Sequence, residues 1–146
     1  MGSARTTGAV TGDGLADLIA GAPFSDPAAG SYAGRCYVIF GKTTSTSIDL
    51  SGVASGLGGF VINGQCSQDQ IGEEVASAGD VNGDGLADLI IGAYASDPAA
   101  GSYAGRSYVV FGKPNTVAID LSAIAAGSGG FAINGQLIGD RSGISV

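Results

Sequence analysis

The sequence predicts an all-β protein built from two copies of one four-stranded unit. Glycine supplies 27 of the 146 residues, and eleven of the thirteen acidic residues are aspartate. Both residue types favour tight turns over helices. Residues 8–65 and 79–136 are identical at 41 of 58 aligned positions, at a constant offset of 71 residues. Each copy also holds short runs of apolar, β-branched and aromatic residues bounded by Gly, Asp or Asn-Gly, which predict strands.

The strands are expected in corresponding places of the two copies. The runs are residues 15–22, 35–42 and 58–64 in the first copy, and residues 71–79, 86–93, 106–113 and 129–135 around the second. Few of these runs alternate cleanly between apolar and polar residues, which is typical of strands that are covered on both faces. Residues 121–127 predict a short helical turn.

Four strands repeated at a fixed period fit a β-propeller blade. We assign residues 1–4 to a leader or cloning remnant, residues 5–75 to the first blade unit, and residues 76–146 to a second unit that ends in the middle of a strand. A unit with two apolar faces cannot bury both by itself, so each unit requires neighbours.

The phase of the repeat predicts how chains would associate. Residues 137–146 match residues 66–75, so the C-terminal half-strand is expected to complete the first unit of another copy. Such a head-to-tail contact closes into homo-oligomeric rings. Propellers have 4–8 blades, and we favour a trimer or a tetramer over a dimer. The alternative is a monomeric fragment with exposed edges, or an irregular aggregate.

Composition excludes several classes of function. The chain has no His, which removes Ser-His-Asp and Cys-His catalysis and His-ligated metals. Its net charge of −7 disfavours nucleic acid and favours cations. No apolar run approaches about 18 residues, so no membrane span is expected. No signal peptide is recognised. Paired aspartates can hydrolyse glycosides, but here their spacing is that of metal ligands.

The main candidate site is the Asp-rich loop at residues 80–88. It places oxygen side chains at positions 1, 3, 5 and 9, with Gly at position 6, as in the first part of an EF-hand loop. The bidentate Glu of position 12 is absent. We expect Ca²⁺ rather than Mg²⁺, which keeps more water. The alternative is an Asx-rich turn that needs no metal. The expected ligands are Asp80, Asn82, Asp84, Asp88 and the backbone carbonyl of Leu86.

The corresponding loop of the first copy is degraded. Position 1 is Ala9, which has no carboxylate, and position 3 is a neutral hydroxyl. We therefore expect weak or absent Ca²⁺ binding there. The oxygen ligands that remain are Thr11, Asp13, Asp17 and the carbonyl of Leu15.

These motifs resemble the FG-GAP repeats of integrin α-subunit propellers and their bacterial relatives. The resemblance rests on residues 21–23 (Gly-Ala-Pro) and 92–94 (Gly-Ala-Tyr), each preceded by the Asp-rich loop, and it covers nearly the whole chain. Ile71 and Ser142 stand where the family has the Phe of its FG pair. The resemblance implies Ca²⁺ on one face of the propeller, ligand-binding loops on the opposite face and side, and an extracellular setting. Family rings are typically seven-bladed, a number that identical two-blade chains cannot reproduce.

Two further features have open interpretations. Cys36 and Cys66 lie near neighbouring strand ends, so a disulfide is possible; the alternative is two free or buried thiols. The repeated loops 25–35 and 96–106 carry Tyr32, Tyr103, Arg35 and Arg106, which could face a ligand. We favour loops that pack on the blade, with each Arg paired to Asp26 or Asp97.

We therefore favour a non-enzymatic, calcium-binding, integrin-like propeller module that self-assembles and serves adhesion or binding of a protein or glycan ligand. One alternative is a structural scaffold or engineered propeller fragment without its own ligand, suggested by the near-identity of the copies. Another is a calcium-dependent hydrolase. The sequence does not name a ligand.

Overall fold

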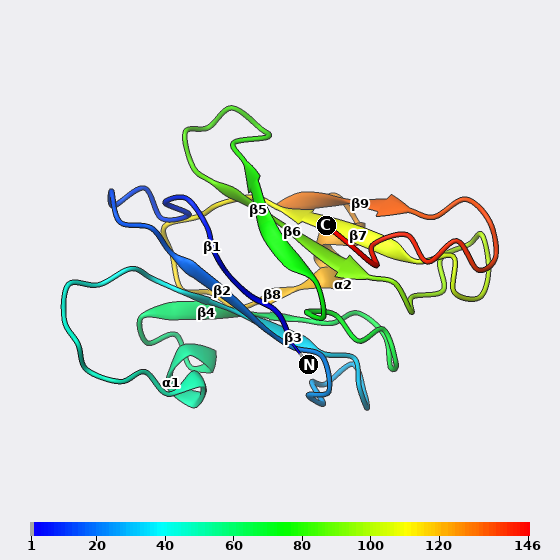
Figure 1. Cartoon of the computed structure of the whole chain (residues 1–146), viewed down its shortest axis with the longest axis horizontal. Helices are drawn as coiled ribbons and strands as arrows, with labels where there is room; N and C mark the ends of the chain where they lie inside the picture. The colour runs from blue at the N-terminus through cyan, green and yellow to red at the C-terminus, as the bar shows by residue number, and fades with distance from the viewer. Residues whose placement is uncertain (1) are drawn as a thin grey trace.

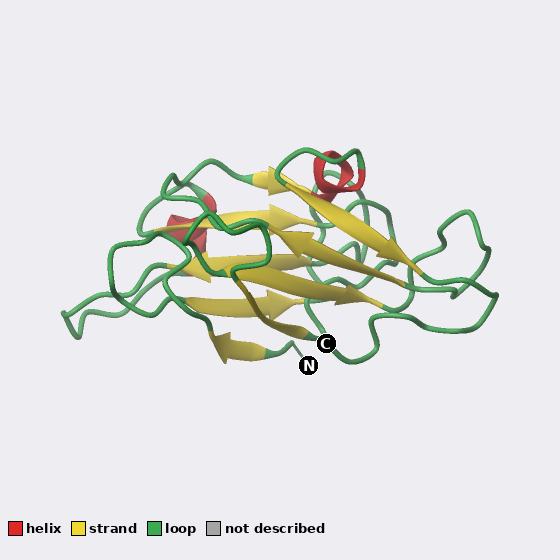
Figure 2. Cartoon of the chain, turned by 90° about the horizontal axis from the view of Figure 1, so that it is seen from above, coloured by secondary structure: helices red, strands yellow, loops and turns green. Residues whose placement is uncertain are grey.

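A computed structural model, which describes residues 2–146, places the chain in two sheets that lie against each other (Figures 1 and 2). The first sheet has the order β1-β2-β3-β4-β8 and the second β5-β6-β7-β9. The first-unit elements are β1 (Ala4–Thr6), β2 (Leu18–Ala22), β3 (Arg35–Ile39), α1 (Leu50–Ala54) and β4 (Gly59–Asn63). The later elements are β5 (Val75–Gly79), β6 (Asp88–Ala93), β7 (Arg106–Val110), β8 (Ile119–Asp120), α2 (Leu121–Ala125) and β9 (Gly130–Asn134).

Every predicted run contains a strand, and the predicted helical turn is α2. Neighbouring strands within each unit pair antiparallel, with Ala20 opposite Tyr37 and, in the second unit, Ile91 opposite Tyr108. The middle residues of β3 and β7 are all buried, because these strands have apolar neighbours on both faces. The two four-stranded units predicted from the sequence are therefore present.

Two of the residues 1–4 assigned to a leader or cloning remnant, Ser3 and Ala4, take part in the first sheet; the assignment itself stays a prediction, and Met1 lies outside the described residues. Ala4 begins β1, where it lies opposite Ala20. Ser3 accepts a hydrogen bond from the N–H of Gly21 at 2.7 Å, as Glu74 accepts one from Gly92 at 2.9 Å in the second sheet. These bonds use only backbone groups, so the side chains of Ser3 and Ala4 gave no sign of them.

That the chain ends in the middle of a strand stays a prediction. The last strand is β9, and Val146 occupies the position equivalent to Val75, the first residue of β5. The C-terminal segment instead contacts its own unit, through a bridge between Gly105 and Ser142 that repeats the bridge between Gly34 and Ile71.

One apolar core joins the two sheets. Ile19 and Phe60 from the first sheet and Leu89 and Tyr108 from the second belong to the same buried cluster. Strand β5 also contacts β1 and β2 of the other sheet. The first sheet is thus buried largely by the second, and the two units depend on each other for their core.

An unpredicted parallel pairing connects the units at their outer edges. Strand β8 of the second unit lies beside β4 of the first, with Ile62 opposite Ile119 and Asn63 opposite Asp120. The Nδ2 of Asn63 donates to Oδ1 of Asp120 at 3.0 Å. We call this contact between the β4 side of one unit and the β8 side of the next the inter-unit junction.

The connection between the sheets is the segment 64–74, so the predicted division after residue 75 falls at the first residue of β5. Within residues 2–146, no helix has the length and apolar character needed to cross a membrane.

Candidate functional site

The two Asp-rich loops occupy equivalent positions in the fold. Residues 80–87 connect β5 to β6, and residues 7–17 connect β1 to β2. Both extend beyond the ends of their strands, at the top and the left of Figure 1. The loops that follow β2, β4 and β6 lie at the other end of the sheets, because consecutive strands run antiparallel.

Asp80 organises the start of the second-unit loop. Its Oδ1 accepts hydrogen bonds from the N–H groups of Gly83 at 2.7 Å and Asp84 at 3.0 Å, and its Oδ2 accepts one from Gly85 at 2.9 Å. Gly85, at position 6, has a φ of +88°, a conformation that glycine adopts without strain. The loop therefore curls around the carboxylate of its first residue.

The middle of the loop is held by Asn82 and Asp84. The N–H of Asp84 donates to Oδ1 of Asn82 at 3.0 Å, and the amide of Asn82 donates to Oδ2 of Asp84 at 2.9 Å. Oδ1 of Asp84 accepts from the N–H of Leu86 at 2.8 Å. The side chains of Asp80, Asn82 and Asp84 are exposed and thus open to solvent cations.

Asp88, at position 9, has a different environment because it is fully buried at the start of β6. Its Oδ2 accepts from the N–H groups of Val81 at 2.7 Å and Asn82 at 3.4 Å. Its Oδ1 accepts from Gly112 at 2.8 Å, just beyond β7. Asp88 therefore ties the loop to the end of a neighbouring strand.

Asp17 does the same in the first unit. Its carboxylate accepts from Val10, Thr11 and Gly41 at 2.8, 3.2 and 2.8 Å. Oδ1 of Asp13 accepts from Leu15 at 2.8 Å, which repeats the bond between Asp84 and Leu86. At position 1, Ala9 supplies no carboxylate, so the hydrogen bonds that Asp80 receives have no counterpart. The Oγ1 of Thr11 is buried without a hydrogen-bond partner.

The donor set of the second-unit loop fits a hard cation. It offers three carboxylates, an amide oxygen and a backbone carbonyl, all oxygen ligands of the kind Ca²⁺ prefers. Within residues 2–146, however, no three acidic side chains come close enough together to hold a metal ion. Asp80 and Asp84 are turned toward backbone N–H groups, so binding would require them to reorient. The calcium site at Asp80, Asn82, Asp84, Leu86 and Asp88, and the weaker one at Thr11, Asp13, Leu15 and Asp17, stay predictions.

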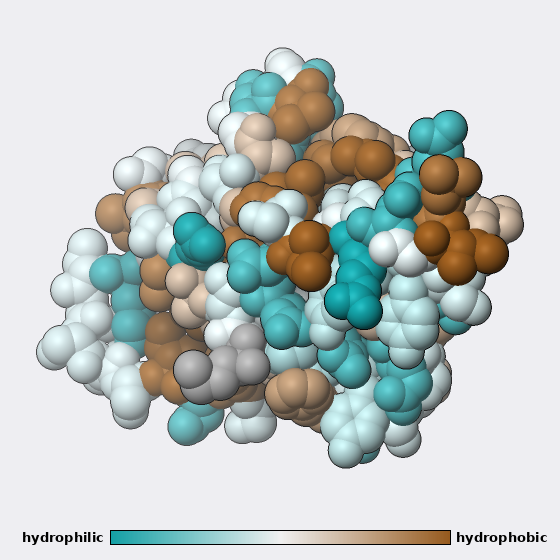
Figure 3. Space-filling view, turned by 45° about the vertical axis from the view of Figure 1, so that its right-hand side comes forward, coloured by the Kyte–Doolittle hydropathy of each residue, from teal (hydrophilic) through white to brown (hydrophobic). Residues whose placement is uncertain are grey.

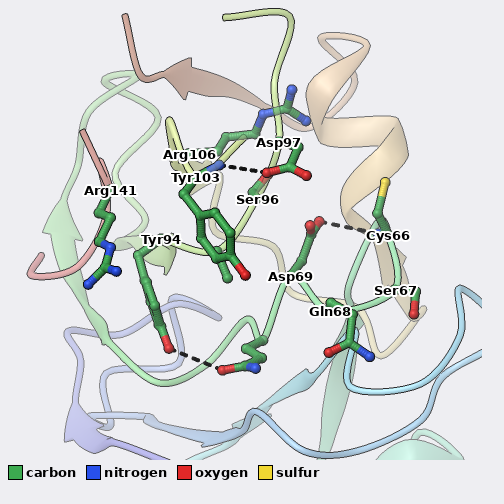
Figure 4. Close-up of a pocket in the computed structure, with 12 residues that line it drawn as sticks. Cys66, Ser67, Gln68, Asp69, Tyr94, Ser96, Asp97, Tyr103, Arg106 and Arg141 are labelled. Atoms are coloured by element: carbon green, nitrogen blue, oxygen red, sulfur yellow. Dashed lines mark hydrogen bonds between the residues drawn. The ribbon is translucent and has the colours of Figure 1, made fainter. Parts of the chain in front are cut away.

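A polar pocket of about 610 Å³ lies at the other end of the sheets, between the segment 66–70 and the loops that follow β6 and β9 (Figure 4). Tyr94 donates to Oε1 of Gln70 at 3.1 Å across it. Asp97 accepts from the N–H of Tyr103 at 2.7 Å, which holds the loop 96–106 in place. Arg106 and Arg141 also line it, so the pocket presents both charges.

Asp69 is the buried acid of this pocket. Burial raises the pKa of its carboxyl to about 6, although the N–H of Cys66, which donates to Oδ2 at 3.2 Å, and the nearby Arg106 act in the opposite direction. The pKa of Tyr94 is raised mainly by burial of its hydroxyl. The pocket therefore contains a carboxyl that titrates in the mildly acidic range.

The possible disulfide between Cys36 and Cys66 is not formed, and both cysteines are free thiols. Cys36 points into the core, opposite Ile62, and burial raises the pKa of its thiol. Cys66 lies three residues beyond the end of β4 on the exposed loop. The strand register, which the sequence did not specify, separates the two sulfur atoms.

The expected pairing of each loop Arg with Asp26 or Asp97 is not found either. Arg35 donates to Oδ1 of Asn63 at 3.2 Å, and Arg106 donates to Oδ1 of Asn134 at 2.7 Å. Asp26, like Asp97, instead accepts from the backbone of its own loop, at the N–H of Tyr32.

The hydrogen bonds by which Asp17 and Asp88 join loop to strand end, and the pairing of β4 with β8, were not predicted from the sequence. Signals for both were present. In each copy, the Asp at position 9 of the Asp-rich loop lies 24 residues before the Gly of the Phe-Gly-Lys motif. The motifs Ile-Asn-Gly-Gln and Ile-Asp-Leu-Ser, which meet at the inter-unit junction, also recur in both copies.

Comparison with known proteins supports the resemblance carried by these motifs. The chain is 36% identical over 121 residues to phosphatidylinositol-glycan-specific phospholipase D of Bos taurus, covering 77% of this chain and 13% of that protein. It is 33% identical over 120 residues to integrin alpha-PS2 of Drosophila melanogaster, covering 78% of this chain and 8% of that protein. The chain thus spans a small part of either relative.

The FG-GAP repeat model matches residues 6–39 and 72–110, which include β2, β3 and the first Asp-rich loop in one unit and β5, β6, β7 and the second loop in the other. FG-GAP repeats form propeller blades, so each sheet corresponds to one blade. The chain belongs to the FG-GAP repeat family.

Proposed function

We propose that the chain is a non-enzymatic, calcium-binding propeller module that associates head to tail with further copies and serves adhesion or ligand binding. The family match supports the propeller, and FG-GAP repeats often bind calcium. The observation that carries the calcium assignment is the loop 80–88. There, the backbone N–H groups of Gly83 and Gly85 converge on Asp80, and the positive φ of Gly85 lets the loop curl, so that its oxygen side chains lie within one short segment.

Bound calcium would offset the electrostatic repulsion among the acidic side chains of the loop 80–88. Asp80, Asp84 and Asp88 bring three negative charges into one nine-residue loop of a chain that already has a net charge of −7. A bound divalent cation offsets these charges and fixes the loop between β5 and β6. The residues of this chain supply the oxygen ligands, and Asp88 connects them to the end of β7 through Gly112.

The proposal is tested by thermal melting of the chain with Ca²⁺, with Mg²⁺ and with a chelator. We expect Ca²⁺ to stabilise the folded chain by about 2.7 kcal/mol at a hundredfold excess over its dissociation constant, and the chelator to remove this gain. An unchanged melting temperature in all three conditions contradicts calcium binding.

The matched variants are Asp84→Asn and Asp13→Asn. Asn keeps the acceptor that Leu86 or Leu15 uses, so both folds are expected to persist. Asp84→Asn should weaken the calcium-dependent stabilisation, whereas Asp13→Asn in the degraded loop should leave most of it. Equal losses in both variants would argue against a main site at residues 80–88.

The proposed ligand-binding surface is the end of the sheets opposite the Asp-rich loops. The pocket lined by Tyr94, Tyr103, Arg106 and Arg141 supports this, because it combines aromatic, charged and amide groups that can contact a protein or a glycan. We propose an extracellular or cell-surface setting, in keeping with adhesion. Binding of an array of glycans and matrix proteins, compared between the wild type and Tyr103→Ala, tests this part; no binding by either favours a scaffold without its own ligand.

A further inference from the structure

The two copies of the repeat differ in burial at equivalent positions. In the second unit, Leu89 and Leu121 are fully buried, whereas their first-unit equivalents, Leu18 and Leu50, are 47% and 40% exposed. The local fold around each pair is the same. The difference therefore follows the neighbour, because within residues 2–146 a preceding unit packs against this side of the second unit and not of the first.

On the opposite side of each unit, the pattern of burial is reversed. Phe60 and Ile62 on β4 of the first unit are fully buried, whereas Phe131 and Ile133 on β9 of the second unit are 39% and 45% exposed. Within the described residues, a following unit covers this side of the first unit and not of the second. Figure 3 shows apolar areas among the polar ones on the side of the molecule that it presents.

We name these two surfaces by their residues. The leading face consists of Leu18, Ile48, Asp49 and Leu50 of the first unit, and the trailing face consists of Phe131, Ile133, Asn134 and Gln136 of the second. Each is the counterpart of one side of the inter-unit junction that the chain already makes within itself.

We propose that the trailing face of one chain binds the leading face of a second copy and repeats the inter-unit junction between chains. This proposal deepens the proposed function, since it rests on the chain being a repeat module that associates with its own kind. In place of the C-terminal half-strand exchange expected from the sequence, the contact joins the outer edges and apolar faces of two folded blades.

The internal junction supplies the expected contacts. The pairing of β4 with β8 predicts that Ile133 and Asn134 of one copy pair with Ile48 and Asp49 of the next. The bond from Asn63 to Asp120 then predicts a bond from Asn134 to Asp49. Asp49 and Asn134 are both exposed in the single chain, so their side chains are accessible for this contact.

Two further sets of side-chain contacts cross the inter-unit junction. Gln65 accepts hydrogen bonds from Arg106 at 2.9 Å and from Tyr108 at 2.8 Å across the junction. Lys113 lies over the ring of Phe60, with its Nζ 4.4 Å from the ring centre. The exposed Gln136 and Phe131 lack such partners from a following unit within residues 2–146, and they would receive equivalent ones from Arg35, Tyr37 and Lys42 of another copy.

The proposed contact joins two different faces, so it can be tested by mixing two variants that each lack one of them. Leu50→Asp places a charge on the leading face, and Ile133→Asp places one on the trailing face. Each variant alone should associate more than ~100-fold more weakly than the wild type, because a charge would be buried without a partner. An equal mixture should form a heterodimer, since each variant keeps the one face that the other needs. Sedimentation velocity and native mass spectrometry measure these species.

The matched control is Leu57→Asp. Leu57 is 71% exposed, and its second-unit equivalent, Ser128, is exposed even beside the preceding unit, so this position lies outside the junction. This variant should assemble like the wild type. Circular dichroism checks that each variant is folded.

A second set of variants avoids any risk to folding. Asn134→Asp keeps the acceptor for Arg106 but sets two carboxylates against each other across the junction, so assembly should weaken. Adding Asp49→Asn in the same chain should restore it. A wild type that stays monomeric at millimolar concentration overturns the proposal, even where calcium binding persists. Assembly that survives both Leu50→Asp and Ile133→Asp overturns this interface while leaving association itself in place.

Discussion

Asp17 and Asp88 show how a single side chain can serve the fold independently of a metal. Each is fully buried, and each accepts two N–H groups from its own loop and one from the glycine that follows a neighbouring strand. The first copy has lost the acid at position 1 but keeps this bond pattern. A buried N–H left without an acceptor costs about 1–3 kcal/mol, which explains why the fold needs this carboxylate in both loops.

Asp69 gives the chain a specific pH dependence. Because burial raises its pKa to about 6 in the folded state, compared with about 3.9 in an unfolded chain, the folded state binds more protons between these values. The contribution of Asp69 to stability therefore falls as the pH rises from 4 to 6. Asp69→Asn should remove this fall, so that its stability relative to the wild type increases over this range in urea unfolding.

The control is Asp140→Asn in the second unit. Asp140 accepts an equivalent bond from the N–H of Leu137 at 2.9 Å, but it is exposed. This change should leave the pH profile between 4 and 6 close to that of the wild type. Identical profiles for Asp69→Asn and the wild type would contradict the role given to burial.

At the scale of elements, glycines determine how closely the segment before β5 approaches β2. A Cβ added at Gly21, the residue before the last of β2, would overlap the backbone carbonyl of Gly72. Gly21→Ala should therefore destabilise the chain by about 1–3 kcal/mol, because backbone must move to make room. Denaturant unfolding measures the change.

Gly52→Ala is the matched substitution in α1. Its Cβ would meet nothing closer than Leu57 at 3.9 Å, and Ala favours the helical conformation. We expect stabilisation of about 0.5–1 kcal/mol. If the two variants changed stability equally, the close approach of Gly72 to β2 would be excluded as the cause.

At the scale of the whole molecule, the second blade buries the first. Phe60 and Phe131 are equivalent residues, and each makes an edge-to-face contact at 6.1 Å, with Phe40 and Phe111 respectively. Phe60→Ala should cost about 3–5 kcal/mol, because it empties a position in the shared core. Phe131→Ala should cost at most about half as much in the dilute, monomeric chain.

The same pair tests whether the two blades unfold together. Since the core cluster contains residues of both sheets, Phe60→Ala should lower one cooperative transition rather than split it into two. Differential scanning calorimetry measures this, and two separate transitions would contradict a shared core.

The sequence by itself determined the repeat, the strands other than β1 and β8, and the composition of the Asp-rich loops. These features depend on local chemistry: β-branched runs such as residues 106–110 form strands, Gly and Asp form the turns, and alternate oxygen side chains mark residues 80–88. It failed where a contact uses only backbone groups, as at Ser3 and Ala4, or depends on register, as at Cys36 and Cys66.

Only the tertiary structure determined which copy of each repeated residue is buried. Phe60 and Phe131, like Leu121 and Leu50, stand at equivalent positions of nearly identical motifs, yet one residue of each pair is buried and the other exposed. Burial depends on what packs against a residue across the blade, and within residues 2–146 each unit has such a neighbour on one of its two sides. The repeated motifs of the chain thus specify the blade, while the packing of one blade on the next specifies the faces that are left for a partner.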